Sequence, residues 1–196
     1  MLPEQFIIIA VIVNLIGYFW YVKNMVLENT KPNLVSWFIW MFTPFIGIFF
    51  QIRAGATLSV LPILMGGFLS LVIIFISLFR KNAYWKINSF DIICGIISLI
   101  ALILYVFTHN LSISILFAII SDALAYFPTI LKSWNFPNTE TGLLYTTGII
   151  SNVLGLLIIK MWIFPIYSFG ISVIFFNSIV LFCIYREKIF RRKIIF

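Results

Sequence analysis

Long apolar runs alternate with short polar breaks along the whole chain. A helix that crosses a bilayer needs about 20 mostly apolar residues, and the runs predict seven such helices, at 3–22, 33–52, 56–79, 90–108, 111–130, 140–159 and 162–185. The first run lacks the basic start of a secretory signal, and no small-residue cleavage site follows it, so we expect it to be retained. The pattern therefore predicts an all-α membrane protein with seven transmembrane helices.

The composition excludes an ordinary soluble domain. Of the 196 residues, 63% are hydrophobic and 10% are charged, whereas soluble domains have roughly 45–50% apolar and 25% charged residues. Cys94 and Cys183 both lie inside apolar runs, which indicates packing rather than a disulfide. The lipid bilayer is thus the main partner that we expect.

The basic residues are divided unevenly between the two sides of the membrane. The connections after the first, third and fifth helices, together with the C-terminal tail, carry 11 of the 13 Lys and Arg residues, and the other side carries Arg53 and Lys160. The positive-inside rule then predicts a cytoplasmic C-terminus and an outer N-terminus in a plasma or inner membrane. The net charge of +7 is explained by this anchoring. We expect no nucleic-acid partner, because no soluble domain carries a basic face.

Signals of enzymatic chemistry are weak. The single histidine, His109, stands at the end of a predicted helix. No cluster of His, Cys and carboxylate residues has metal-ligand spacing, and no Gly-rich loop is suited to a phosphate. We expect no enzyme activity, no metal and no cofactor.

Matching residues recur at an offset of slightly more than 100 positions. The matches are Tyr18-Phe19 with Tyr126-Phe127, Pro32-Asn33 with Pro137-Asn138, and Leu61-Pro62-Ile63 with Phe164-Pro165-Ile166. They predict two parallel three-helix repeats, 1–81 and 111–185, joined by a linker helix within 82–110 and followed by a basic tail, 186–196. Chance matching between two Ile- and Phe-rich segments is the alternative explanation.

This 3+1+3 plan resembles the SWEET and PQ-loop transporter superfamily. The most similar stretch runs from Tyr126 to Lys132 and is followed by Asn138-Thr139-Glu140. The PQ dipeptide itself is absent, since Pro128-Thr129 stands at its place in the second repeat. The resemblance implies alternating-access transport of a sugar or a similar small polar solute. Trp37-x-x-Trp40 is also similar to nicotinamide riboside transporters of the same plan, which leaves a vitamin substrate open.

Polar residues deep inside the apolar runs are candidates for a substrate site. Asp122 is the one acidic residue in the interior of a predicted helix, and Asn14 is its equivalent in the first repeat. Such residues face the bundle interior or a watery cavity. We predict a substrate site made of Asn14, Trp40, Asp122, Asn152 and Asn177. The alternatives are a carboxyl group bonded to nearby hydroxyls, such as that of Ser121 or a tyrosine, and amides that only join helices.

Other residues have expected structural roles. Pro44 and Pro128 interrupt helical hydrogen bonding and are candidate hinges. Asn33 and Asn138 are expected to cap the helices that follow them, with Glu140 in a first turn. Trp37, like Trp20, Trp85, Trp134 and Trp162 near helix ends, is expected in the interfacial aromatic belt.

The sequence therefore favours a SWEET-like transporter of a small polar solute, either by facilitated diffusion or coupled to protons through Asp122. The alternative is a non-transporting membrane receptor or a trafficking or assembly factor on the same fold. A retinal photoreceptor is excluded because no predicted helix has a lysine in its interior. A homo-oligomer remains open.

Overall fold

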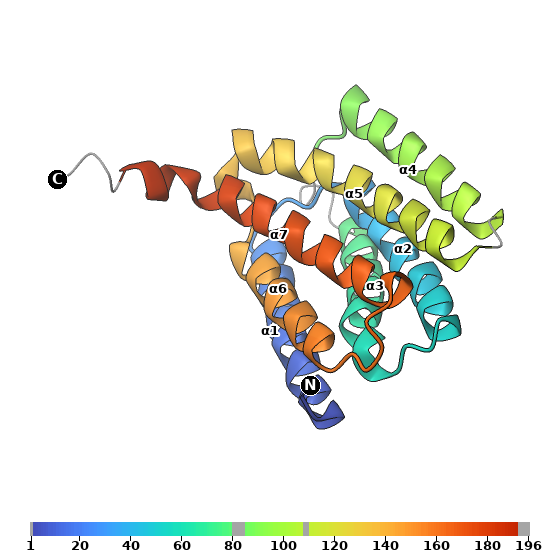
Figure 1. Ribbon diagram of the computed structural model, residues 1–196. Helices are drawn as coiled ribbons and strands as arrows, with labels where there is room; N and C mark the ends of the chain where they lie inside the picture. Colours follow the sequence, from blue (N-terminus) through green and yellow to red (C-terminus); the bar gives the residue numbers. More distant parts are fainter. Residues whose placement is uncertain (1, 80–84, 108–109, 192–196) are drawn as a thin grey trace.

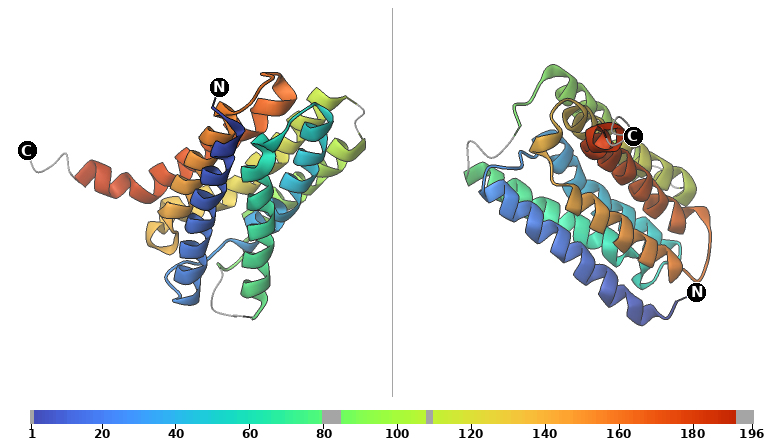
Figure 2. Two further views of the ribbon diagram at one scale, coloured as in Figure 1. Left: turned by 90° about the horizontal axis from the view of Figure 1, so that it is seen from below. Right: turned by 90° about the vertical axis from the view of Figure 1, so that its left-hand side faces the viewer.

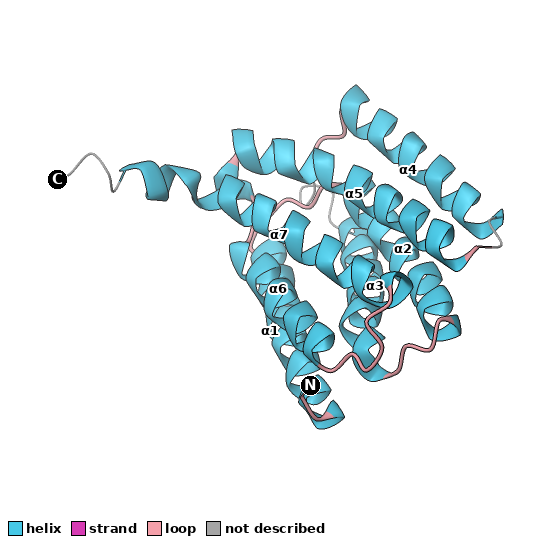
Figure 3. Cartoon of the chain, in the orientation of Figure 1, coloured by secondary structure: helices cyan, strands magenta, loops and turns pink. Residues whose placement is uncertain are grey.

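The computed structural model describes residues 2–79, 85–107 and 110–191, and within these ranges the chain is helical throughout, without strands (Figure 1, Figure 3). Seven α-helices are present: α1 Ile7–Val26, α2 Leu34–Arg53, α3 Leu61–Phe79, α4 Ser89–Phe107, α5 Leu111–Asn135, α6 Gly142–Leu157 and α7 Phe164–Arg191. The prediction of an all-α protein with seven helices at these places is confirmed. His109 and four of the basic residues, Arg80, Lys81, Arg192 and Lys193, lie outside the described residues.

Five of the helices are long and apolar enough to cross a membrane. These are α1, α2, α3, α5 and α7, whereas the apolar parts of α4 and α6 are shorter, at Ser89–Leu104 and Gly142–Leu157. Large apolar side chains cover the outside of the bundle, among them Phe19 and Leu78, which are 70% and 72% exposed. A surface of this kind suits a hydrocarbon environment and not water. The chain is therefore an integral membrane protein.

Six of the helices pack into a ring. Helix α3 packs against both α1 and α2, and α7 packs against both α5 and α6. The ring closes because α1 packs against α6 and α2 packs against α5. Helix α4 lies at the edge of the bundle, where it contacts α5 and α2, and the last turns of α7 project beyond the other helices (Figure 1, Figure 2).

A glycine permits the close approach of α1 and α6. A Cβ atom at Gly17 would collide with the side chain of Thr147, and it would also lie 3.3 Å from the Cα atom of Leu144. Small residues of this type let membrane helices approach closely enough for good van der Waals packing. The same surface of α1 therefore cannot accept a larger side chain without moving α6.

The helix ends confirm one predicted cap and correct another. The side chain of Asn33 accepts hydrogen bonds from the backbone N–H groups of Val35 and Ser36, at 3.1 and 3.4 Å, and so caps α2. Asn138 does not cap α6, because it lies in a 3₁₀ turn, Pro137–Thr139, and α6 begins later, at Gly142. The residue before α6, Thr141, makes no side-chain cap either. Its hydroxyl instead bonds to the Thr30 hydroxyl in the loop between α1 and α2 and accepts from Asn24 Nδ2 of α1.

Candidate functional site

A cavity of about 80 Å³ lies inside the ring and is lined by side chains from all six ring helices. One water needs roughly 10–15 Å³ of such volume, so the cavity has room for several waters. It contains every residue that the sequence predicts for the substrate site: Asn14 from α1, Trp40 from α2, Asp122 from α5, Asn152 from α6 and Asn177 from α7. All five are buried, none more than 8% exposed. The structure thus brings together residues that are up to 163 positions apart in the chain.

Asp122 has one bonded and one unbonded carboxylate oxygen. Its Oδ1 accepts a hydrogen bond from Thr43 Oγ1 in α2, at 3.2 Å. Its Oδ2 is buried and has no hydrogen-bond partner among the described residues. A nearby hydroxyl thus bonds to the carboxyl group, as the structural alternative predicts, but the partner is Thr43 and not Ser121, whose hydroxyl donates to the Ser98 carbonyl oxygen in α4, at 2.8 Å. Successive residues of a helix point about 100° apart, and this separates Ser121 from the cavity side of α5.

Two of the three amides bond to a neighbouring helix, and the third bonds within its own helix. Asn14 Nδ2 donates to the carbonyl oxygen of Pro62 at the start of α3, at 3.1 Å. Asn177 Oδ1 accepts from the Tyr126 hydroxyl across α7 and α5, at 2.9 Å. Asn152 Nδ2 donates within its own helix, to the Gly148 carbonyl oxygen. These bonds fix the amides in place at the cavity wall and leave them part of its polar lining.

An aromatic wall forms the side of the cavity that faces the α1–α2 and α5–α6 loops. Trp37 is part of it, so its assignment to the interfacial belt is wrong: it is 1% exposed and lines the cavity. The reason is the direction in which α2 faces, since Trp37 packs edge-on against Tyr18 and Trp40, with ring centroids 6.1 and 5.3 Å apart. Trp40 in turn packs on Tyr126 of α5, at 4.6 Å. We call Tyr18, Trp37, Trp40 and Tyr126 the aromatic wall.

The two predicted hinge prolines occupy different positions. Pro44 lies in the interior of α2, is buried and lines the cavity. A Cβ atom at Gly67 of α3 would lie 3.2 Å from the Pro44 Cβ atom, so the two helices are close at this point. Pro128 lies in the interior of α5 and is buried, but it is not part of the cavity lining. A hinge role for either residue stays a prediction.

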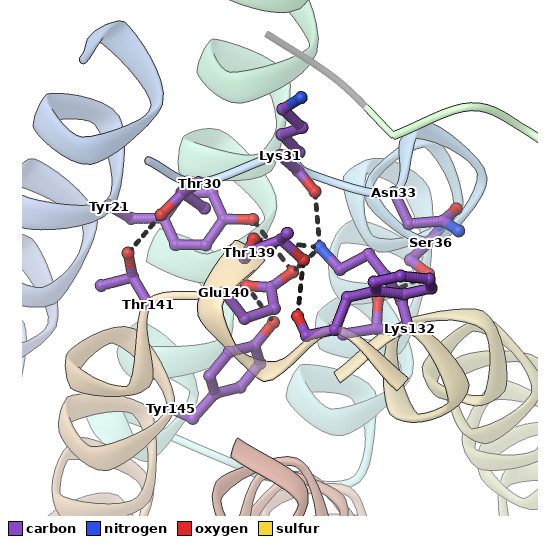
Figure 4. Close-up of polar contacts among 12 residues, drawn as sticks. Tyr21, Thr30, Lys31, Asn33, Ser36, Lys132, Thr139, Glu140, Thr141 and Tyr145 are labelled. Atoms are coloured by element: carbon purple, nitrogen blue, oxygen red, sulfur yellow. Dashed lines mark hydrogen bonds and ion pairs between the residues drawn. The ribbon is translucent and has the colours of Figure 1, made fainter. Parts of the chain in front are cut away.

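A buried ion pair lies beyond the aromatic wall. Lys132 Nζ is 2.5 Å from Glu140 Oε1, and the two side chains are 1% and 0% exposed (Figure 4). Lys132 Nζ also donates to the backbone carbonyl oxygens of Lys31 and Thr139, at 2.5 and 3.4 Å. This corrects the sequence-based positions of both residues, because Lys132 lies in the last turns of α5 and is buried, not in the connection that follows, and Glu140 is not in the first turn of α6.

Two tyrosines join this ion pair to the cavity. The hydroxyls of Tyr21 and Tyr145 donate to the two carboxylate oxygens of Glu140, at 3.4 and 3.2 Å. Tyr145 lines the cavity, and the ring of Tyr21 packs against Trp37, with centroids 5.0 Å apart. No pattern in the sequence predicts this cluster of Tyr21, Lys132, Glu140 and Tyr145, which we call the loop-side cluster. A pair of opposite charges flanking one short loop was its only sequence signal.

The arrangement is suited to holding a small polar molecule. A buried carboxylate, three amides and an indole converge on one volume inside a membrane bundle. The buried ion pair adjoins this volume through Tyr145, which lines the cavity and bonds to Glu140. Among the described residues, no group of three or more His, Cys, Asp or Glu side chains is placed to hold a metal ion. No protein-family model, no curated protein and no solved structure matches the chain.

Proposed function

We propose that this protein is a transporter that carries a small polar solute across the membrane by alternating access. The observation that carries the proposal is the cavity at the centre of the six-helix ring, lined by Asn14, Trp40, Asp122, Asn152 and Asn177. Polar groups at membrane depth are costly unless they serve a partner or a watery path. In transporters made of repeats, the substrate site lies at the interface between the repeats.

The packing of the helices supports a 3+1+3 repeat. Replacing α1 by α5, α2 by α6 and α3 by α7, and the reverse, leaves the pattern of packed helix pairs in the ring unchanged. The pair of α1 and α6 becomes the pair of α5 and α2. In each triplet, the helix that packs against both others is the third along the chain, α3 or α7. Two parallel repeats related by an axis through the cavity would have this property. The pattern favours the SWEET and PQ-loop resemblance and a linker role for α4.

Alternating access requires a closure on one side at a time, and the loop-side cluster is a candidate for one closure. It joins the α1–α2 loop, the end of α5 and the loop before α6 through Lys132 and Glu140. The charge bias of the loops assigns this side to the cytoplasm. A cavity as small as about 80 Å³ fits an occluded state, since sites for drug-sized ligands occupy roughly 300–1,000 Å³. Pro44 and Pro128 are placed in different triplets, where bending of α2 or α5 would open the ring.

Facilitated diffusion is the simplest mechanism, and Asp122 offers proton coupling as a variant. The titratable groups that share the cavity lining with Asp122 are the hydroxyls of Tyr18 from α1, Tyr126 from α5 and Tyr145 from α6. Thr43 of α2 bonds to Asp122 directly. A carboxyl group in this position takes up or releases a proton most easily when the cavity opens to water.

Uptake into liposomes tests the role of Asp122. The purified full chain is reconstituted, and uptake of radiolabelled sugars and vitamins is measured with and without a pH gradient. We expect Asp122→Asn to abolish uptake or its dependence on the gradient, with unchanged folding by gel filtration. Ser178→Ala is the matched control, because that exposed hydroxyl bonds only within its own helix, to the Ile174 carbonyl oxygen. Equal uptake and pH response in both variants would remove Asp122 from the mechanism.

A second experiment tests alternating access without knowledge of the substrate. Cys94 and Cys183 are replaced by alanine, and a single cysteine is placed at Leu144, which lines the cavity. A membrane-impermeant maleimide added to either side of the liposomes should label Leu144→Cys from both sides at different times of the cycle. Labelling from one side only would contradict the proposal and favour a receptor.

A further inference from the structure

The charges of the cavity lining are one-sided. Asp122 is the only residue with a formally charged side chain among the residues that line the cavity, which include no Lys, Arg or His. Lys132, a buried lysine on the same helix as Asp122, is already paired with Glu140. An ionised carboxylate in a low-dielectric interior is unfavourable without a counter-charge. Whenever Asp122 is ionised, the cavity lining therefore supplies no positive charge to balance it.

Two residues of the aromatic wall, Trp40 and Tyr126, lie one helical turn from the contact between Thr43 and Asp122. Trp40 precedes Thr43 by three positions on α2, and Tyr126 follows Asp122 by four positions on α5. Residues three or four apart share a helix face. The Thr43–Asp122 bond and the Trp40–Tyr126 ring contact of 4.6 Å therefore form two adjacent layers of the same helix–helix contact. A positive group beside the carboxylate would lie against aromatic faces, which attract cations.

Two indole N–H groups of the wall, those of Trp37 and Trp40, have no acceptor among the described residues, and the one on Trp40 lies one turn from Thr43. Trp40 Nε1 is buried and has no hydrogen-bond partner among the described residues, although Trp40 lines the cavity. An indole N–H donates only, so its natural complement is an oxygen atom. Asp122 Oδ2 is the complementary case, a buried acceptor without a donor. One of these atoms is a donor and the other an acceptor, and they belong to α2 and α5, which pack against each other.

Resting on the transport function proposed above, we propose that the solute is a small organic monocation that also carries an oxygen atom. Its positive group pairs with Asp122 against the aromatic wall, and its oxygen accepts from Trp40. A neutral sugar offers hydroxyl donors to the carboxylate but leaves its charge uncompensated. The cavity of about 80 Å³ limits such a cation to a few heavy atoms unless the ring widens.

Choline and its uncharged analogue test the proposal directly. The probes are choline, tetramethylammonium, which has the charge but no oxygen, 3,3-dimethylbutan-1-ol, which has the shape of choline without the charge, and glucose. The full chain in detergent is titrated with each probe, and the rise of the thermal midpoint with concentration gives an apparent affinity. We expect saturable stabilisation by choline and tetramethylammonium, and none by the neutral alcohol or glucose at the same concentrations.

Two variants separate the contributions. Asp122→Asn should weaken the binding of both cations by about tenfold or more, because the charge partner is lost. Trp40→Phe keeps an aromatic face but removes the N–H donor, so the preference for choline over tetramethylammonium should fall towards one. If the Asp122→Asn variant is not folded, the comparison of choline with its neutral analogue on the unaltered protein still decides the question.

Uptake of the same probes distinguishes failure of this inference from failure of the transport function. Stabilisation by glucose or by the neutral alcohol equal to that by choline, or no stabilisation by either cation, overturns the cation proposal. Uptake of glucose without any effect of the cations leaves transport standing and overturns the cation proposal. Saturable binding of choline without uptake into liposomes supports the cation site and overturns transport.

Discussion

The ion pair of the loop-side cluster offers a quantitative test, through the variant Glu140→Gln. The change leaves the Lys132 ammonium, whose side chain is 1% exposed, without a counter-charge. Removing one partner of a buried pair costs about 3–5 kcal/mol. Lys132 keeps the carbonyl oxygens of Lys31 and Thr139 as acceptors, so we expect the lower end, about 3 kcal/mol. In a chain of this length, 1 kcal/mol moves the midpoint of unfolding by about 2–4 °C, which predicts a decrease of about 6–12 °C.

Thermal unfolding in detergent, followed by tryptophan fluorescence, measures this decrease. The matched control is Glu4→Gln, which breaks the pair between Glu4 and Lys160 at 2.6 Å, where the side chains are 36% and 65% exposed. Exposed pairs contribute about 0–1 kcal/mol, so this midpoint should hardly change. Replacing both buried partners, in Lys132→Met with Glu140→Leu, should restore part of the loss, because no unpaired charge remains. A decrease for Glu140→Gln no larger than that for Glu4→Gln would refute the reasoning.

Two further predictions concern packing and orientation. Gly17→Ala should lower the unfolding free energy by about 1–3 kcal/mol, because the new Cβ collides with Thr147; Gly47→Ala, whose nearest neighbour would be 3.6 Å away, should leave the midpoint unchanged or higher. Equal midpoints for the two variants would show that α1 and α6 can separate freely. Orientation is tested with single cysteines in the cysteine-free background. A cysteine at Lys160 should react with an impermeant maleimide in intact cells, whereas one at Lys188 should react only in opened cells. The reverse result would invert the predicted topology.

The positions of the helices were predictable because a bilayer imposes a length on them. An apolar run must cover the hydrocarbon thickness, and this requirement is visible in the sequence without knowledge of any contact. The ends of the helices were less predictable, since they depend on which polar groups are used elsewhere. Asn33 caps α2 by a bond to residues two and three positions away. Thr141 before α6 instead bonds to Thr30, 111 positions away, and no local pattern contains that information.

The candidate site was predictable to the extent that polarity at membrane depth forces a side chain inwards. Asp122 and the three asparagines satisfy that condition, and the structure places them around one cavity. The burial of Trp37, Lys132 and Glu140 was not predictable in this way, because residues near the end of a predicted helix are equally suited to the membrane interface. Their burial is decided by the folding of two loops over the end of the ring, where the Lys31 and Thr139 carbonyl oxygens meet the lysine.

The closure of the ring within one covalent chain determines how many charges its centre can hold. A ring made of two identical three-helix chains would contain every inward-facing residue twice, so a carboxylate at the position of Asp122 would face a second one across the cavity. Two such groups would repel each other, and one of them would remain protonated. In the present chain, Asn14 and Asp122 are encoded separately and differ. An odd number of charges, here one, is therefore accessible to a single chain but not to a symmetric pair.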